Sequence, residues 1–212
     1  MQIAILLFDQ LTALDAVGPY ETLSRIPGAT VTFVATEARP YRTDTGSLAL
    51  LADATLDELA HPEIVVVPGG PGEAGAREDE ATLGWLRTAH ETSRWTTSVC
   101  TGSLVLAAAG LLDGRRATSH WSALGALRAL GADAVSERVV VDGKLITAAG
   151  VSAGIDMGLT LAATLAGDDV AEAIQLGIEY DPQPPFDRGA IHKARPEVVE
   201  LLRSTSRFTA DV

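Results

Sequence analysis

The sequence predicts an α/β fold on a mostly parallel sheet, in a single domain that spans residues 1–212. Short runs rich in β-branched residues alternate with longer helical segments, which is the pattern of βαβ units. One run, Ile64–Val67, is apolar at every position, as expected for a central strand covered on both faces. With 47% hydrophobic residues, a chain of 212 residues is long enough to bury a sizeable core.

Strand and helix signals alternate through the first half of the chain. The strands are short apolar or β-branched runs, the helices carry an apolar seam, and Gly46 marks a turn. The predicted elements are a strand at Gln2–Phe8, a helix at Asp15–Ile26, a strand at Thr30–Ala35, a hairpin or irregular excursion at Pro40–Leu51, a strand at Ile64–Val67 and a helix at Asp79–Glu91.

The second half begins with the strand Trp95–Val99, which gives way at Cys100 to a helical run. Asp142-Gly143 is a strong hairpin signal between two later strands. The predicted elements are strands at Arg116–Ser119, Arg138–Val141 and Leu145–Ala148, then helices at Ala153–Ala166 and Asp169–Glu179. The proline-rich stretch at 181–186 is incompatible with a helix.

Composition argues against several classes of partner. The formal net charge of −12 opposes binding to nucleic acid or to an anionic membrane surface. No apolar run approaches the length of a membrane span, and the early Asp9 is unlike a signal peptide. One cysteine excludes an intrachain disulfide, and the four histidines show no zinc-type spacing, so we expect a cytoplasmic protein without a metal.

Cys100, the single cysteine, lies at a strand-to-helix elbow. There the free backbone N–H groups of the first helical turn and the helix dipole favour a thiolate, and they can also hold an anionic intermediate. We therefore expect an activated nucleophile with a lowered thiol pKa. The alternative is a buried cysteine that acts only as a small hydrophobic residue.

Two further segments are expected beside Cys100, because ligands of open parallel sheets lie beyond the carboxyl ends of the strands. Asp15 follows the first strand and Gly69-Gly70 follows the central one. Asp15 is a candidate proton carrier, with a helix N-cap as the alternative. The Gly70 and Thr101 amides are candidate donors to an anion, although the glycines fit a simple turn as well.

Several motifs resemble the DJ-1/PfpI superfamily across nearly the whole chain. They are Val66–Gly70, Ser98–Gly102, Ala109–Thr118 and His120-Trp121. Leu14-Asp15, Gly150–Asp156 and Glu179–Pro182 are most similar to its isocyanide hydratase branch. The resemblance implies a flavodoxin-like, class I glutaminase-like, doubly wound sheet with the cysteine at its elbow. It also implies a homodimer.

The resemblance further implies cofactor-free hydration of a small-molecule isocyanide. Cys100 would form a thioimidate, Asp15 would carry protons, and the Gly70 and Thr101 amides would hold negative charge. The alternatives are a thiol sensor or binding protein, a glyoxalase or a cysteine hydrolase. Related domains also occur in transcription regulators, but these continue into a helix-turn-helix domain, and the acidic balance of this chain argues against that role.

Three residues are expected to support this site. His120 follows a predicted strand and either orients the site or is a structural, hydrogen-bonded histidine. Trp121 is a candidate pocket-lining residue, and Ser152 a candidate contact to the pocket. The residue after the cysteine is Thr101 where some relatives carry histidine, so a Cys-His pair is not expected.

Overall fold

The structure, a computed structural model, describes residues 1–208 and has an α/β fold with a seven-stranded, mostly parallel sheet. The strand order is β10-β11-β7-β6-β1-β2-β5, and only β10 is antiparallel to its neighbour. The strands are β1 Gln2–Leu6, β2 Thr30–Ala35, β5 Ala54–Thr55, β6 Ile64–Val67, β7 Trp95–Val99, β10 Val139–Asp142 and β11 Leu145–Ala148.

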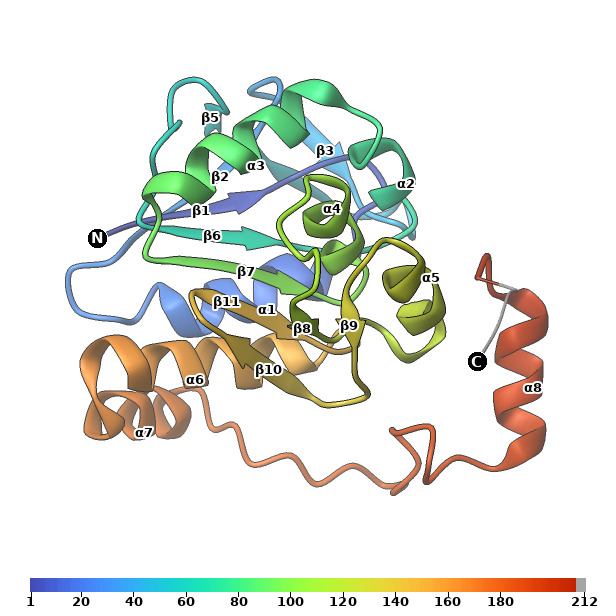
Figure 1. The fold of residues 1–212 in the computed structure, drawn as a ribbon. Coiled ribbons are helices and arrows are strands. Elements are labelled where there is room, and N and C mark those ends of the chain that lie inside the picture. The colour runs from blue at the N-terminus through green and yellow to red at the C-terminus, as the bar shows by residue number, and fades with distance from the viewer. Residues whose placement is uncertain (209–212) are drawn as a thin grey trace.

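Helices cover both faces of this sheet (Figure 1), which makes the fold doubly wound. They are α1 Ala13–Leu23, α2 Glu73–Ala76, α3 Glu80–Thr92, α4 Gly102–Ala108, α5 Leu124–Ala129, α6 Ala153–Ala166, α7 Asp168–Gly177 and α8 Pro196–Thr205. Helices α3, α4 and α5 pack on one face, and α1, α6 and α7 on the other.

Alternation of side chains along the central strands supplies both halves of the core. In β1, Ala4 and Leu6 point to the α3–α4–α5 face, whereas Ile3 and Ile5 point to the α1–α6–α7 face. All four residues of β6 are fully buried, which explains why that strand is apolar throughout. The parallel strands end at one edge of the sheet, and this edge carries Cys100.

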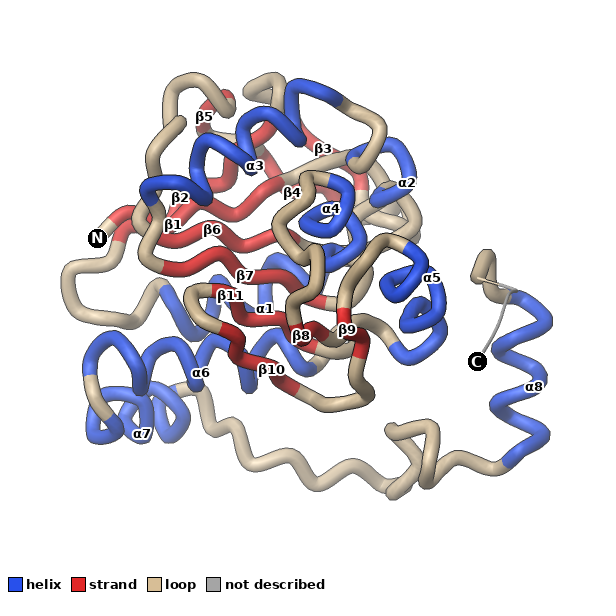
Figure 2. Tube along the Cα trace, in the orientation of Figure 1, coloured by secondary structure: helices blue, strands red, loops and turns tan. Residues whose placement is uncertain are grey.

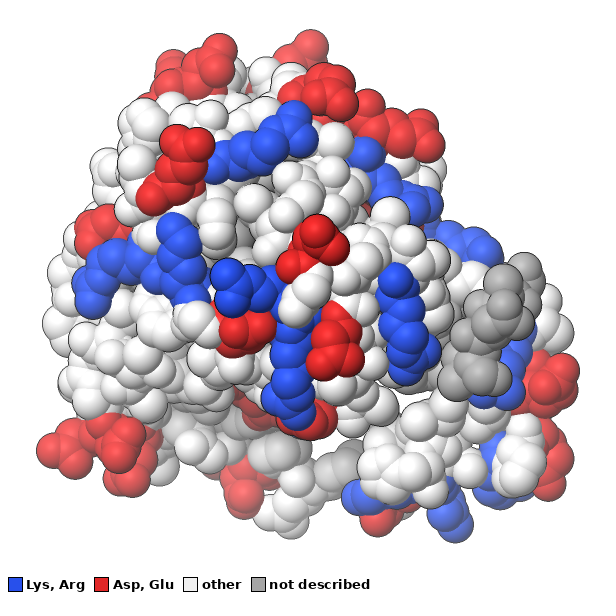
Figure 3. All heavy atoms as spheres, viewed as in Figure 1, with Lys and Arg blue, Asp and Glu red and all other residues white. Residues whose placement is uncertain are grey.

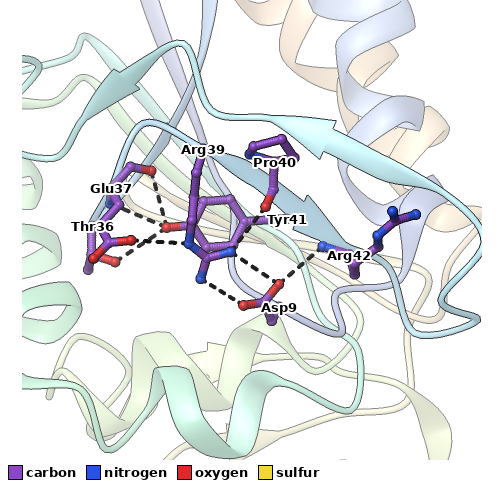
Figure 4. A network of polar contacts seen from close by, with 7 residues as sticks. All are labelled: Asp9, Thr36, Glu37, Arg39, Pro40, Tyr41 and Arg42. Atoms are coloured by element: carbon purple, nitrogen blue, oxygen red, sulfur yellow. Dashed lines mark hydrogen bonds and ion pairs between the residues drawn. The ribbon is translucent and has the colours of Figure 1, made fainter.

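The excursion at 40–51 is a hairpin of β3, Pro40–Arg42, and β4, Ala49–Leu51. It is tied to the loop after β1 by Asp9, which accepts from Arg39 Nη2 at 2.8 Å and from the Arg42 N–H at 3.1 Å (Figure 4). Thr12 Oγ1 also donates to Asp44 at 2.8 Å. The hairpin thereby fixes the segment that leads into α1.

Several elements differ from those that the sequence predicts. Arg116–Ser119 is not a strand of the main sheet: only Arg116–Ala117 forms a strand, β8, and it pairs with β9, Asp133–Ala134. The Thr118 N–H instead donates to Thr147 Oγ1 at 2.8 Å, so the chain turns toward the side chains of β11 there. Helices α2, α5 and α8 are additions to the predicted set.

A long extended segment, residues 178–195, connects α7 to α8 (Figure 2). It crosses to the side of the molecule toward which the parallel strands point, and α8 lies there (Figure 1). No residue of α8 is buried.

Acidic and basic side chains are interspersed on the face of the molecule in Figure 3. Among residues 1–208, no helix is long and apolar enough to cross a membrane. The cytoplasmic location stays a prediction.

Candidate active site

Cys100 lies at a sharp elbow between β7 and α4. Its φ of +57° is in the left-handed region, which is rare for a residue with a side chain and costs on the order of 1–3 kcal/mol. Four contacts hold this conformation. The Cys100 N–H donates to the carbonyls of Ala148 and Ala149 at 3.0 and 2.8 Å, and its carbonyl accepts from Ser103 and Ser119 Oγ at 3.1 and 3.0 Å.

Asp15 lies in the first turn of α1 and is fully buried. It is not the helix cap, because Thr12 occupies that position. Its Oδ2 accepts from the Gly69 N–H at 2.9 Å, and the Cys100 thiol lies close enough to the carboxyl for each group to shift the pKa of the other. Oδ1 has no well-formed hydrogen bond among the described residues, so a buried acceptor remains open beside the sulfur.

Burial raises the pKa values of both members of this pair, and the Asp15 charge raises that of Cys100 further. Desolvation raises the pKa of Asp15 to about 7, against the hydrogen bond from Gly69. Desolvation and the Asp15 charge raise the pKa of Cys100 to about 12. The predicted lowering of the thiol pKa is therefore wrong: the pKa of Cys100 is raised, so the sulfur keeps its proton at neutral pH.

Backbone N–H groups of Thr101 and Val151 face the Cys100 sulfur and favour its charged form. The sequence predicts the first of these donors but not the second. Val151 precedes α6, and a backbone amide leaves no side-chain signal in the sequence. Two helix-start segments, at α4 and α6, thus supply donors to the same atom.

The loop at 68–72 packs directly on the elbow. A Cβ added at Gly69 would lie 2.5 Å from the Thr101 nitrogen, so only glycine fits there. Gly70 has a φ of +127°, and its N–H donates to Thr101 Oγ1 at 3.0 Å. The Gly70 amide is thus beside the site as expected, but it is engaged by the Thr101 hydroxyl.

The three supporting residues lie at the margin of the site or outside it. His120 Nδ1 is paired with Ser122 Oγ at 2.8 Å, and burial lowers the pKa of its imidazole. Trp121 lies beside it, with ring centroids 5.5 Å apart. Ser152 is exposed and its Oγ accepts from Arg138 at 3.4 Å, in a surface network.

His120 does reach the site indirectly. A Cβ on Gly150 would lie 2.8 Å from His120 Cδ2, so the ring packs on the segment that presents the Val151 amide. The three groups that the structure brings to the Cys100 sulfur are therefore the Asp15 carboxyl and the Thr101 and Val151 amides. Such a site can move a proton between sulfur and carboxylate while two N–H groups stabilise the anion.

Comparison with known proteins agrees with this architecture. Residues 1–164 match the DJ-1/PfpI family. The chain belongs to the DJ-1/PfpI family. It is 46% identical over 203 residues to an isonitrile hydratase of Pseudomonas putida, covering 96% of this chain and 89% of that protein.

A solved structure of a ThiJ/PfpI family protein from Pseudomonas syringae superposes with a TM-score of 0.92. It is 40% identical, and the match covers 95% of this chain and 84% of that one. A helix-turn-helix transcriptional regulator of Pseudomonas aeruginosa is 35% identical over 108 residues, which cover 50% of this chain and 32% of the regulator. The similarity to the hydratase extends much further along both chains.

Proposed function

We propose that this protein hydrates isocyanides to N-formamides, with Cys100 as nucleophile and Asp15 as acid and base. The observation that carries the proposal is the buried Cys100–Asp15 pair, in which a thiol lies beside a carboxyl whose pKa is raised to about 7. The similarity to an isonitrile hydratase over 96% of the chain supports the substrate class.

In the first step, the Cys100 sulfur attacks the terminal carbon of R–N≡C while the Asp15 carboxylate takes the thiol proton. Asp15 then gives this proton to the same carbon, and the product is the thioimidate Cys–S–CH=N–R. The thiol is consumed and no other reactant is required. A carboxyl with a pKa near neutrality suits both halves of this transfer.

In the second step, a water molecule adds to the thioimidate carbon, Asp15 takes one of its protons, and the nitrogen is protonated. The C–S bond then breaks, which releases R–NH–CHO and returns the proton to the sulfur. The open Oδ1 of Asp15 is the acceptor available to this water. Isocyanide and water together account for every atom of the formamide, so no cofactor enters the balance.

The backbone N–H groups of Thr101 and Val151 stabilise the negative charge on the Cys100 sulfur in these steps, since they already face that atom. The Gly70 amide reaches an anionic intermediate only after its hydrogen bond to Thr101 Oγ1 opens. We therefore assign Gly70 a secondary role in charge stabilisation, and a first role in holding the elbow.

The test is hydration of a simple alkyl isocyanide, followed by loss of isocyanide and appearance of the N-formamide. In water labelled with ¹⁸O, the formamide oxygen should carry the label. Cys100→Ala should abolish turnover, with Ser152→Ala as a matched control, because that hydroxyl is exposed and bonded to Arg138. Unchanged turnover in Cys100→Ala, or no formamide from the wild type, would refute the proposal and favour a thiol sensor.

A further inference from the structure

Arg207, near the end of the described chain, reaches the loop that packs on Cys100. Its guanidinium donates to the Gly70 carbonyl at 2.8 Å and to the Pro71 carbonyl at 2.5 Å. It also lies 3.1 Å from a carboxylate oxygen of Glu73. One side chain, 136 residues away from Pro71 in the sequence, thus binds three groups of one short segment.

The carboxylate in this cluster is deeply buried. The Glu73 side chain is 1% exposed and is flanked by two guanidinium groups, Arg77 at 3.1 Å and Arg207 at 3.1 Å. Two positive charges and one negative charge leave one net positive charge directly behind the Gly70-Pro71 peptide. Burial lowers the pKa of the Arg207 guanidinium, whereas Glu73 and Cys100 act to raise it.

The loop needs such an anchor because glycines occupy three of its five positions, 69, 70 and 72. The first half is held from the other side, since the Gly69 carbonyl accepts from the Thr12 N–H at 2.9 Å. The second half begins after Gly70, which has a φ of +127°. The Gly70 carbonyl accepts hydrogen bonds from the Arg207 guanidinium and from the Glu73 N–H, the latter at 3.1 Å.

We propose that Arg207 is a positioning residue of the active site, which fixes the Gly70–Pro71 peptides against the elbow and places a positive charge behind the Cys100–Asp15 pair. With these peptides fixed, the amides of Gly69 and Gly70 stay directed at Asp15 and Thr101. The positive charge favours the state in which the pair has lost one proton. This inference rests on the proposed role of the pair as the reacting groups.

An ordinary surface ion pair would not have this effect. Exposed pairs contribute little because water screens them. Arg207 is 35% exposed, but the carboxylate it meets is buried and both carbonyls belong to the loop over the sulfur. The other charged groups around the pair are Asp44, which acts on Asp15, and Arg77 and Glu73, which act on Arg207.

The test measures the rate of Cys100 alkylation by iodoacetamide between pH 5 and 9, read by intact mass, and requires no isocyanide turnover. Arg207→Gln removes the charge, and Arg207→Lys keeps it while losing the two-carbonyl geometry. Arg195→Gln is the control, because this exposed arginine precedes α8 on the same segment and its side chain makes no hydrogen bond or ion pair with residues 1–208.

We expect the midpoint of the alkylation profile to rise in Arg207→Gln, so that alkylation near pH 6 slows about three- to tenfold. Arg207→Lys should keep a midpoint near that of the wild type, and Arg195→Gln should match the wild type throughout. An Arg207→Gln midpoint equal to that of Arg195→Gln would overturn the proposal, as would a Lys variant that titrates like the Gln variant. The alkylation assay would still test this proposal if the wild type failed to hydrate isocyanides, because alkylation depends on the thiol alone.

Discussion

The Asp15→Asn variant tests two effects of the Asp15 carboxyl separately: its role in isocyanide turnover and its effect on the stability of the folded protein. Asparagine keeps the shape of the side chain and an oxygen for the Gly69 N–H, but it neither ionises nor carries the transferred proton. If Asp15 is the acid and base, isocyanide turnover should fall by roughly a hundred- to ten-thousand-fold. Cys100 should still be alkylated at alkaline pH, because the sulfur and its two N–H donors are retained and the Asp15 charge that raises the thiol pKa is removed.

The same substitution should change how stability depends on pH. Burial raises the pKa of Asp15 from 3.8 to about 7, so the folded state binds a proton that the unfolded state releases. This favourable contribution is complete below pH 3.8 and is lost as the pH rises to about 7. The shift corresponds to about 4 kcal/mol at most, since one pKa unit is about 1.4 kcal/mol.

The assay is urea unfolding of both proteins at pH 4, 6 and 8. Relative to Asp15→Asn, the wild type should lose up to about 4 kcal/mol of unfolding free energy between pH 4 and pH 8. Because all other titrating groups are common to both proteins, the difference isolates this carboxyl. A difference that is flat across this range would refute the raised pKa, and undiminished turnover in the variant would refute the proton-transfer role.

Three further predictions concern the site and the assembly. The value of kcat/KM for isocyanide should rise with pH through about 7, as Asp15 ionises, and a flat profile from pH 5 to 9 would contradict its role as the base. Gly69→Ala should lower turnover and destabilise the fold by about 1–3 kcal/mol in thermal or urea unfolding, because its Cβ would lie 2.5 Å from the Thr101 nitrogen; wild-type behaviour would show that the loop yields easily. Sedimentation should show a homodimer, the state that the family resemblance implies, and a monomer at micromolar concentration would contradict it.

Strands that consist mostly of apolar or β-branched residues and are bounded by clear breaks are predictable to the residue. β2, β6 and β7 begin and end as predicted, and so does α6. The Arg116–Ser119 run has only one β-branched residue, and only Arg116 and Ala117 pair, outside the main sheet. Helix α8 is missing from the predicted set although its sequence is amphipathic and begins with Pro196, a common first residue of helices; its apolar residues Leu201 and Leu202 stay exposed and no residue of the helix is buried.

Some residues of the site are predictable from the local sequence, and others are not. Cys100 and Asp15 lie at element junctions that the sequence reveals, and the structure brings them together. Val151 contributes a backbone amide and Arg207 arrives from the far end of the chain. Both depend on how separate segments pack, which periodicity and local motifs do not encode.

The thiol pKa shows why local reasoning is insufficient at the elbow. A helix N-terminus favours an anion by about 0.3–1 kcal/mol, and by about 2 kcal/mol in a partly buried geometry. Raising the pKa of Cys100 from 9.0 to about 12 corresponds to about 4 kcal/mol in the opposite direction. Burial and the Asp15 charge therefore outweigh the dipole. In the proposed mechanism, nucleophilic attack therefore draws on proton transfer to Asp15 as the substrate carbon approaches, and not on a thiolate that exists beforehand.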